Sequence, residues 1–147
     1  MHVRTQIREL VENRLKARMT DVTFAESRFT KHRKLPAVSV YMDDETVESE
    51  DESVHPEFRD YSRFPDLVIE LALEGDEHYE TASEDLLVQV EEVMATDDSL
   101  GGLTAEVELS SVVNNYDPRE AEPMATMAVT YRVWYRTRAQ DPQTAIA

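Results

Sequence analysis

The spacing of apolar side chains predicts an amphipathic helix at the start of the chain. Between residues 3 and 19, apolar residues recur every three or four positions, which is the spacing of one helix face. This stripe consists of Val3, Ile7, Leu10, Val11, Leu15 and Met19. The opposite face carries charged residues such as Arg4, Arg8 and Arg14. We expect the apolar face to pack on a core, because the acidic remainder of the chain would repel an anionic membrane.

A second helix is expected between residues 81 and 96. Thr81 and Glu84 have the spacing of a capping box, which marks the first turn of a helix. The apolar stripe that follows consists of Ala82, Leu86, Leu87, Val90, Val93 and Met94. Residues 97–102 contain two glycines and predict a turn.

Four segments predict strands. Residues 35–42 form a short strand with Pro36 at its first position, where a missing N–H matters least. Apolar and polar residues alternate in residues 64–74, 105–110 and 124–136, as in half-buried strands. The alternation is longest in the last of these, where Met127 to Tyr135 and Thr126 to Trp134 occupy opposite faces.

The remaining segments predict loops. Residues 43–61 have no apolar periodicity and indicate either a long loop or a protruding hairpin, and residues 114–123 indicate a polar loop. Residues 138–147 are expected to form a flexible C-terminal tail. The order of elements predicts one α+β domain over residues 1–137, with a mixed or antiparallel sheet of about four to five strands and two helices on one face.

Length and composition agree with one domain and exclude several classes of protein. The chain has 147 residues, enough for a single core, and 41% of them are hydrophobic. It has no Cys, which excludes disulfides, zinc–thiolate sites and cysteine nucleophiles. Only three Gly are present, too few for a glycine-rich phosphate loop of the common kinds. No apolar run approaches the ~20 residues that span a bilayer, and the N-terminus lacks the apolar centre of a signal peptide.

Charge is unevenly distributed along the acidic chain. The formal net charge is −16, but residues 1–34 contain nine Lys or Arg and four acids. Residues 35–131 contain three Lys or Arg and 26 acids. Residues 35–131 are too acidic for tight nucleic-acid binding, because that binding depends on Lys and Arg that neutralise phosphates. The uneven charge suits contacts between copies or partners of opposite charge, although acids also serve simply to keep a protein soluble.

Searches for catalytic and metal-binding motifs find none that is complete. No two of the four His residues have the i, i+4 spacing of a helical metal pair, and the acids of residues 43–52 lack the central Gly of a calcium loop. Pro65, Asp66 and Glu70 resemble part of a nuclease motif, but Ala72 stands where its Lys is needed. There is no G-x-S-x-G motif. We therefore expect no catalytic residue, no metal and no cofactor, and a protein that is not an enzyme.

The order of these segments resembles a known family. The basic helix is followed by Phe24-Ala25-Glu26-Ser27-Arg28 and by Leu35-Pro36-Ala37-Val38-Ser39-Val40-Tyr41. An acidic hairpin region, an alternating strand, an acidic helix and two closing strands that include Val129-Thr130-Tyr131 come next. Over about residues 4–135, this pattern resembles the tail terminator (minor tail protein U) family of lambda-type long-tailed bacteriophages.

The resemblance implies a structural role in virion assembly. Members of that family form a hexameric ring that caps the tail tube, stops its growth and joins it to the head. The implied partners are further copies of the chain, the tail tube protein and the head-side connector protein. The resemblance also implies that DNA passes through the bore without specific binding, and we expect no membrane partner. The implied location is the neck of the virion tail, after assembly in the host cytoplasm.

Five residues are candidate assembly contacts. Asp43, Asp44 and Glu45 belong to the acidic region, which we expect to order on a partner such as the tube end. Arg59 and Arg63 are nearly the only cations in the acidic body, so they are candidates for pairing across a subunit boundary or for ordinary surface ion pairs. Two alternative functions stay open, namely another phage neck protein (head- or tail-completion protein) and an acidic DNA mimic that inhibits a DNA-binding enzyme.

Overall fold

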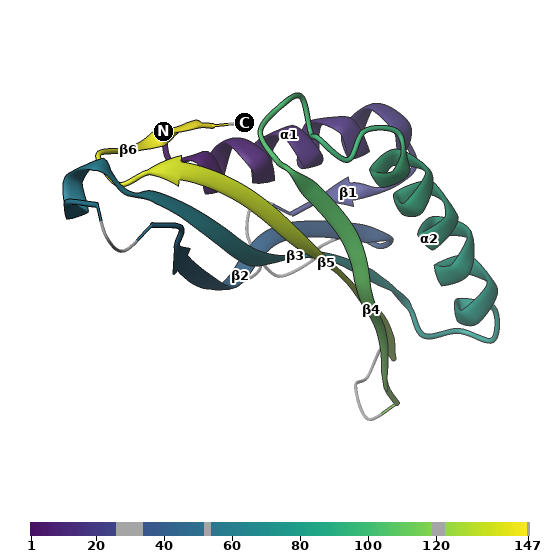
Figure 1. The fold of residues 1–147 in the computed structure, drawn as a ribbon. Helices are drawn as coiled ribbons and strands as arrows, with labels where there is room; N and C mark the ends of the chain where they lie inside the picture. The colour runs from purple at the N-terminus through teal and green to yellow at the C-terminus, as the bar shows by residue number, and fades with distance from the viewer. Residues whose placement is uncertain (26–33, 52–53, 119–122, 147) are drawn as a thin grey trace.

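The computed structural model describes residues 1–25, 34–51, 54–118 and 123–146. Two helices, α1 (Val3–Arg18) and α2 (Tyr79–Ala95), pack on one face of a mixed, strongly curled sheet of six strands, which confirms the expected α+β class (Figure 1). The main path of the sheet is β1 (Thr23–Phe24), β2 (Ala37–Ser49), β3 (Asp60–Glu74), β5 (Met124–Arg138) and β4 (Glu106–Asp117). Among the described strand pairs, β1–β2 is parallel and the others are antiparallel.

The core lies between the helices and the central strands. Alternate residues of β3, from Leu67 to Leu73, and of β5, from Ala125 to Tyr135, point to this side and are buried. The stripe predicted for the first helix supplies the other side, with Val3, Ile7, Val11, Leu15 and Met19 buried. Every second residue of the strands and every third or fourth residue of the helix therefore face the same core.

Helix α2 begins two residues before the expected capping box, so that prediction is wrong. Thr81 lies inside the helix, and the N-cap position is occupied by His78. The carboxylate of Asp76 accepts a hydrogen bond of 2.8 Å from the His78 N–H, which satisfies a donor just before the helix. The predicted C-terminal end is confirmed, because Thr96 is the C-cap.

The acidic region after residue 42 is a hairpin, which was one of the two alternatives. Strand β2 continues to Ser49 and pairs with β3, whose first residue is Asp60. The short helix η1 (Pro56–Phe58) lies in the connection. A bulge between Met42 and Glu45 interrupts the β2–β3 register and separates the buried half of β2 from its exposed half.

Strand β4 is longer than the alternation predicted. It runs to Asp117, and β4 and β5 form a long hairpin that projects beyond the rest of the sheet (Figure 1). Residues 114–117 therefore belong to a strand and not to the expected polar loop, of which residues 119–122 lie outside the described part. Most β4 side chains are exposed, so the second half of the strand has no alternation of apolar and polar residues that would reveal it in the sequence.

The C-terminal segment is also ordered differently from the prediction. Residues 141–145 form β6 (Asp141–Ala145), which pairs with the end of β5, so the expectation of a flexible tail is wrong for this segment. The Ile146 N–H donates to the Arg136 carbonyl at 3.0 Å. Gln143 accepts a 2.7 Å hydrogen bond from the amino group of Met1, which brings the two termini together.

Candidate assembly surfaces

Glu45 and Arg63, two of the candidate contacts, pair with each other inside one chain. Arg63 Nη1 lies 3.1 Å from Glu45 Oε2, and the two side chains are only 16% and 10% exposed. The register of the β2–β3 hairpin brings the two residues close, since Glu45 pairs with Pro65. The ion pair that we considered across a subunit boundary is thus found within the subunit.

Three more residues complete this partly buried cluster. Arg4 of α1 places Nη1 3.4 Å from Glu45 Oε1, and the Tyr135 hydroxyl donates a 2.6 Å hydrogen bond to the same oxygen. Thr137 Oγ1 accepts from Arg63 Nε at 2.9 Å. Burial, followed by the bond to the Glu45 carboxylate, raises the pKa of Tyr135 above its ordinary value. The cluster joins α1, β2, β3 and β5, so its role in this chain is to hold the fold together.

The other three candidates lie nearer to solvent. Asp43 and Asp44 are exposed at the β2 bulge, and the main-chain carbonyl of Asp43 accepts from Arg4 Nη2 at 2.9 Å. Arg59 is partly buried after η1, where its Nε donates to the Val54 carbonyl at 3.0 Å. Their contribution to assembly stays a prediction.

The basic residues of α1 do not form a separate positive face. Arg14 pairs with Asp97 at 3.1 Å, and Arg18 pairs with Glu92 of α2 at 3.2 Å. Lys16 pairs with Glu12 one turn away at 3.1 Å. Much of the positive charge that the sequence gathers in its first helix is therefore matched by acids of the same chain. Arg28, Lys31 and Arg33 lie outside the described residues.

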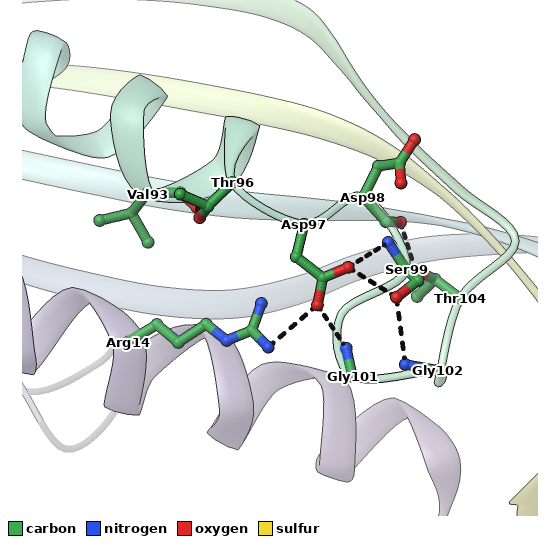
Figure 2. Close-up of polar contacts among 9 residues, drawn as sticks. All are labelled: Arg14, Val93, Thr96, Asp97, Asp98, Ser99, Gly101, Gly102 and Thr104. Atoms are coloured by element: carbon green, nitrogen blue, oxygen red, sulfur yellow. Dashed lines mark hydrogen bonds and ion pairs between the residues drawn. The ribbon is translucent and has the colours of Figure 1, made fainter.

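The turn after α2 is built around one carboxylate (Figure 2). Asp97 Oδ1 accepts from the Ser99 N–H at 3.0 Å and from the Ser99 hydroxyl at 2.6 Å. Its Oδ2 accepts from the Gly101 N–H at 2.9 Å and pairs with Arg14. These donors, the Ser99 hydroxyl first, hold the pKa of Asp97 well below its ordinary value. The turn thereby fixes the start of the connection from α2 to β4 and links this connection to α1.

The sheet face opposite the helices contains an aromatic hollow of about 300 Å³. Phe64 and Trp134 stack with ring centroids 6.0 Å apart, and the Arg132 guanidinium lies 5.2 Å from the Phe64 ring. Glu106 and Glu108 of β4 complete its lining. Sequence reasoning missed this hollow because Phe64 and Trp134 are distant in the chain. The available signal was a Trp on the otherwise polar face of the final strand.

Apolar side chains are exposed along β4, at one end of the sheet. We call this group the β4 edge surface. It consists of Leu109, Val112, Val113 and Tyr116 of β4, and each is between 37% and 57% exposed. Cross-strand pairing places Leu109 and Val112 on the helix side, opposite Tyr131 and Val129, while Val113 pairs with Ala128 on the other face. Tyr116 stacks on Tyr79 at 4.9 Å. Exposed apolar side chains therefore occur on both faces of one strand, an arrangement typical of interaction surfaces.

Acidic residues are concentrated in the part of the chain that contains the β4 edge surface. Residues 76–117, which include α2 and β4, contain twelve Asp or Glu and no Lys or Arg. This part of the chain therefore carries only negative formal charge, of which Asp97 and Glu92 are paired with Arg14 and Arg18 of α1.

Comparisons with known proteins do not assign this chain to a family. Comparison with protein-family models gives no match, and comparison with curated proteins gives no match either. Within the described ranges, no group of three or more His, Asp or Glu side chains is placed to hold a metal ion. In the same ranges, no helix has the length and apolar character needed to cross a membrane.

Proposed function

We propose that this protein is a structural virion protein, a ring-forming tail terminator that caps the tail tube and provides the surface for head–tail joining. The order of elements from α1 to β5 is the order on which the family resemblance rests. The observation that carries the proposal is the β4 edge surface, an open sheet edge with exposed apolar side chains at the end of a curled sheet.

A ring needs two different surfaces on each subunit, one for each neighbour. An open strand edge supplies one of them directly, because its main-chain groups accept another strand. The aromatic hollow supports the proposal as well, since it offers two aromatic rings and side chains of both signs to a partner residue. The net charge of −16 fits a bore through which DNA moves without binding, because like charges repel phosphates.

The first test is the mass of the purified protein by light scattering after size exclusion, over a range of protein and salt concentrations. A mass near six subunits is expected. Co-expression with a tail tube protein from the same genome should then give tubes that carry a ring at one end in electron micrographs. Tubes of unlimited length without such a ring would overturn the tail terminator role.

The acidic stretch of residues 76–117 also favours a second candidate, an inhibitor that mimics DNA. Such a protein presents carboxylates where DNA presents phosphates. It is expected to be a monomer or dimer that binds a basic DNA-binding enzyme and is displaced by duplex DNA. Competition of this kind, together with the lack of a ring, would favour the mimic over the terminator.

A further inference from the structure

Three neighbouring strands build the aromatic hollow on the sheet face opposite the helices. Phe64 of β3 stacks on Trp134 of β5 with ring centroids 6.0 Å apart. Glu106 and Glu108 of β4 and Arg132 of β5 complete the lining. In the β4–β5 register Glu106 is opposite Trp134 and Glu108 is opposite Arg132, so both carboxylates lie on the same face as the rings. The volume of about 300 Å³ is small for a ligand pocket and suits a single side chain.

Hydrogen bonds hold the Trp134 ring in place without a partner. Its indole N–H donates to Ser62 Oγ at 3.1 Å, and the Ser62 hydroxyl donates to Glu50 Oε1 at 2.8 Å. Arg136 Nε donates to the same Glu50 oxygen at 2.5 Å. Because the ring is already fixed, a group that stacks on it has little side-chain freedom to remove, which favours binding.

The two carboxylates of the hollow are unpaired within the described part of the chain. Glu106 and Glu108 are exposed, and no hydrogen bond or ion pair in that part involves either carboxylate. The guanidinium of Arg132 lies 5.2 Å from the Phe64 ring. Asp66 of β3 is opposite Arg132 in the β3–β5 register and adds a third carboxylate to this face. The hollow therefore combines an aromatic surface with an excess of negative charge.

This combination favours a flat, positively charged side chain. An anionic group would be repelled by the two glutamates, and an apolar group would remove them from water without giving them a partner. An arginine guanidinium stacks on aromatic faces and has five N–H donors, enough for both carboxylates. A lysine ammonium has the charge but neither the flat shape nor the paired donors.

We infer that the aromatic hollow binds an arginine side chain of a partner protein, stacked on the Trp134 ring and paired with Glu106 and Glu108. The inference rests on the proposed function for the existence of a protein partner, and it names the side chain that this partner contributes. A partner with a basic surface suits the hollow better than a second copy, because every copy has a net charge of −16.

The probe for this site is N-acetyl-arginine amide. Saturation-transfer difference NMR detects a weakly bound ligand through its own signals, and it should show saturable binding in the millimolar range at about 0.15 M salt. The neutral isostere N-acetyl-citrulline amide should bind at least about tenfold more weakly, because it lacks the charge that pairs with the glutamates. Equal binding of the citrulline compound, or of N-acetyl-lysine amide, would overturn the inference.

Neutral variants of the two glutamates test the position of the site. Glu106→Gln with Glu108→Gln should weaken binding of the arginine probe by about fivefold or more. Glu9→Gln with Glu84→Gln changes two exposed acids of α1 and α2, makes the same change in net charge, and should leave binding unaltered. Equal weakening by both pairs would mean that overall charge attracts the probe, and it would overturn the site.

Arg132→Gln is expected to change the affinity in the opposite direction. Removing a like charge from the lining should strengthen binding of the arginine probe by about twofold or more. Glu106, Glu108 and Arg132 are all exposed, so these variants should keep the Tm of the natural chain. Unchanged or weaker binding in the Arg132→Gln variant would overturn the proposed position of the guanidinium.

The mass of the Glu106→Gln, Glu108→Gln variant distinguishes a different protein from a second copy. A mass equal to that of the natural protein is expected if the hollow binds another protein. A smaller oligomer would overturn that choice and indicate a second copy as the occupant.

These results are separable from the test of function. Capped tubes, with a protein that does not distinguish the arginine probe from the citrulline compound, would leave the tail terminator role standing and overturn the inference. Selective binding of the arginine probe with uncapped tubes would support the inference and overturn the role.

Discussion

Asp97, in the turn after α2, and Arg14, in α1, form an ion pair with 3.1 Å between Oδ2 and Nη2. The same carboxylate organises the turn through Ser99 and Gly101. The Asp97 side chain therefore links the turn that precedes β4 to α1, the helix that covers part of the core. Since its ionised form accepts all these bonds, the pKa of Asp97 is depressed in the folded protein.

This depression predicts a pH-dependent effect of Asp97→Asn. A carboxylate with a lowered folded pKa stabilises the protein fully above its unfolded pKa of about 3.9, and this stabilisation is lost as pH falls towards the folded pKa. The variant should therefore unfold at lower urea concentration than the natural chain at pH 7, and the difference should shrink below about pH 4. Asp98→Asn is the matched control, because the Asp98 carboxylate points away from the turn (Figure 2). An unchanged difference between pH 7 and pH 3.5 would contradict the role of the carboxylate.

Tyr135→Phe is expected to lower the free energy of unfolding by about 1.5–3 kcal/mol, the usual range for a hydrogen bond to a charged group. The change removes the 2.6 Å bond to Glu45 and leaves that carboxylate with one donor fewer in a partly buried cluster. Tyr131→Phe is the control. Tyr131 is also buried, and within the described part of the chain no hydrogen bond involves its hydroxyl. Burial, helped by Glu91, raises the pKa of Tyr131 to about 12. We expect its variant to unfold at nearly the same denaturant concentration as the natural protein, and an equal loss in both variants would exclude a special role for Glu45.

Val90→Ala and Val88→Ala should separate the two faces of α2. Val90 is fully buried in the core, so its truncation is expected to cost about 1–3 kcal/mol. Val88 is 53% exposed, and Ala is the better helix former, so its variant should stay within about 0.5 kcal/mol of the natural chain. Both values should be measured at a protein concentration low enough to exclude association. Similar losses for the two variants would mean that α2 is rotated from its position in the structure.

Removal of residues 141–147 should reduce stability, because β6 pairs with β5 and Gln143 holds the N-terminus. The loss of a few hydrogen bonds at about 0.5–1.5 kcal/mol each predicts a fall of several degrees in Tm. Deletion of Ala147 alone is the control and should leave Tm unchanged. If the longer truncation also leaves Tm unchanged, the segment is the flexible tail that the sequence suggested.

Burial explains which elements were predictable. The helix of residues 3–18 and the strands around Leu67 and Val129 bury one face, so their periodicity is visible in the sequence. The second half of β2 and nearly all of β4 bury neither face, and their composition is polar or irregular as a result. Tertiary pairing decides such segments, and a single sequence does not reveal it.

The candidate contacts show the same limit. Glu45 and Arg63 were recognised as candidate contacts, but their location in one partly buried cluster follows from the hairpin register and from Tyr135, which is 90 positions further along the chain than Glu45. The β4 edge surface was missed because Val112, Val113 and Tyr116 lie beside Ser and Asn residues that suggested a loop. The net charge of the chain could be read from the sequence, whereas the ion pair between Arg18 of α1 and Glu92 of α2 could not.

Trp134 is the one tryptophan of the chain, and it lies half-buried in the aromatic hollow with its indole N–H bonded to Ser62. The protein therefore contains an intrinsic fluorophore at a single, known place on the sheet face away from the helices. A partner that fills the hollow changes the polarity around the indole and shifts its emission, whereas events confined to the helix side leave the spectrum unaltered. Binding to this face can be followed in the unlabelled protein, in real time and at low concentration.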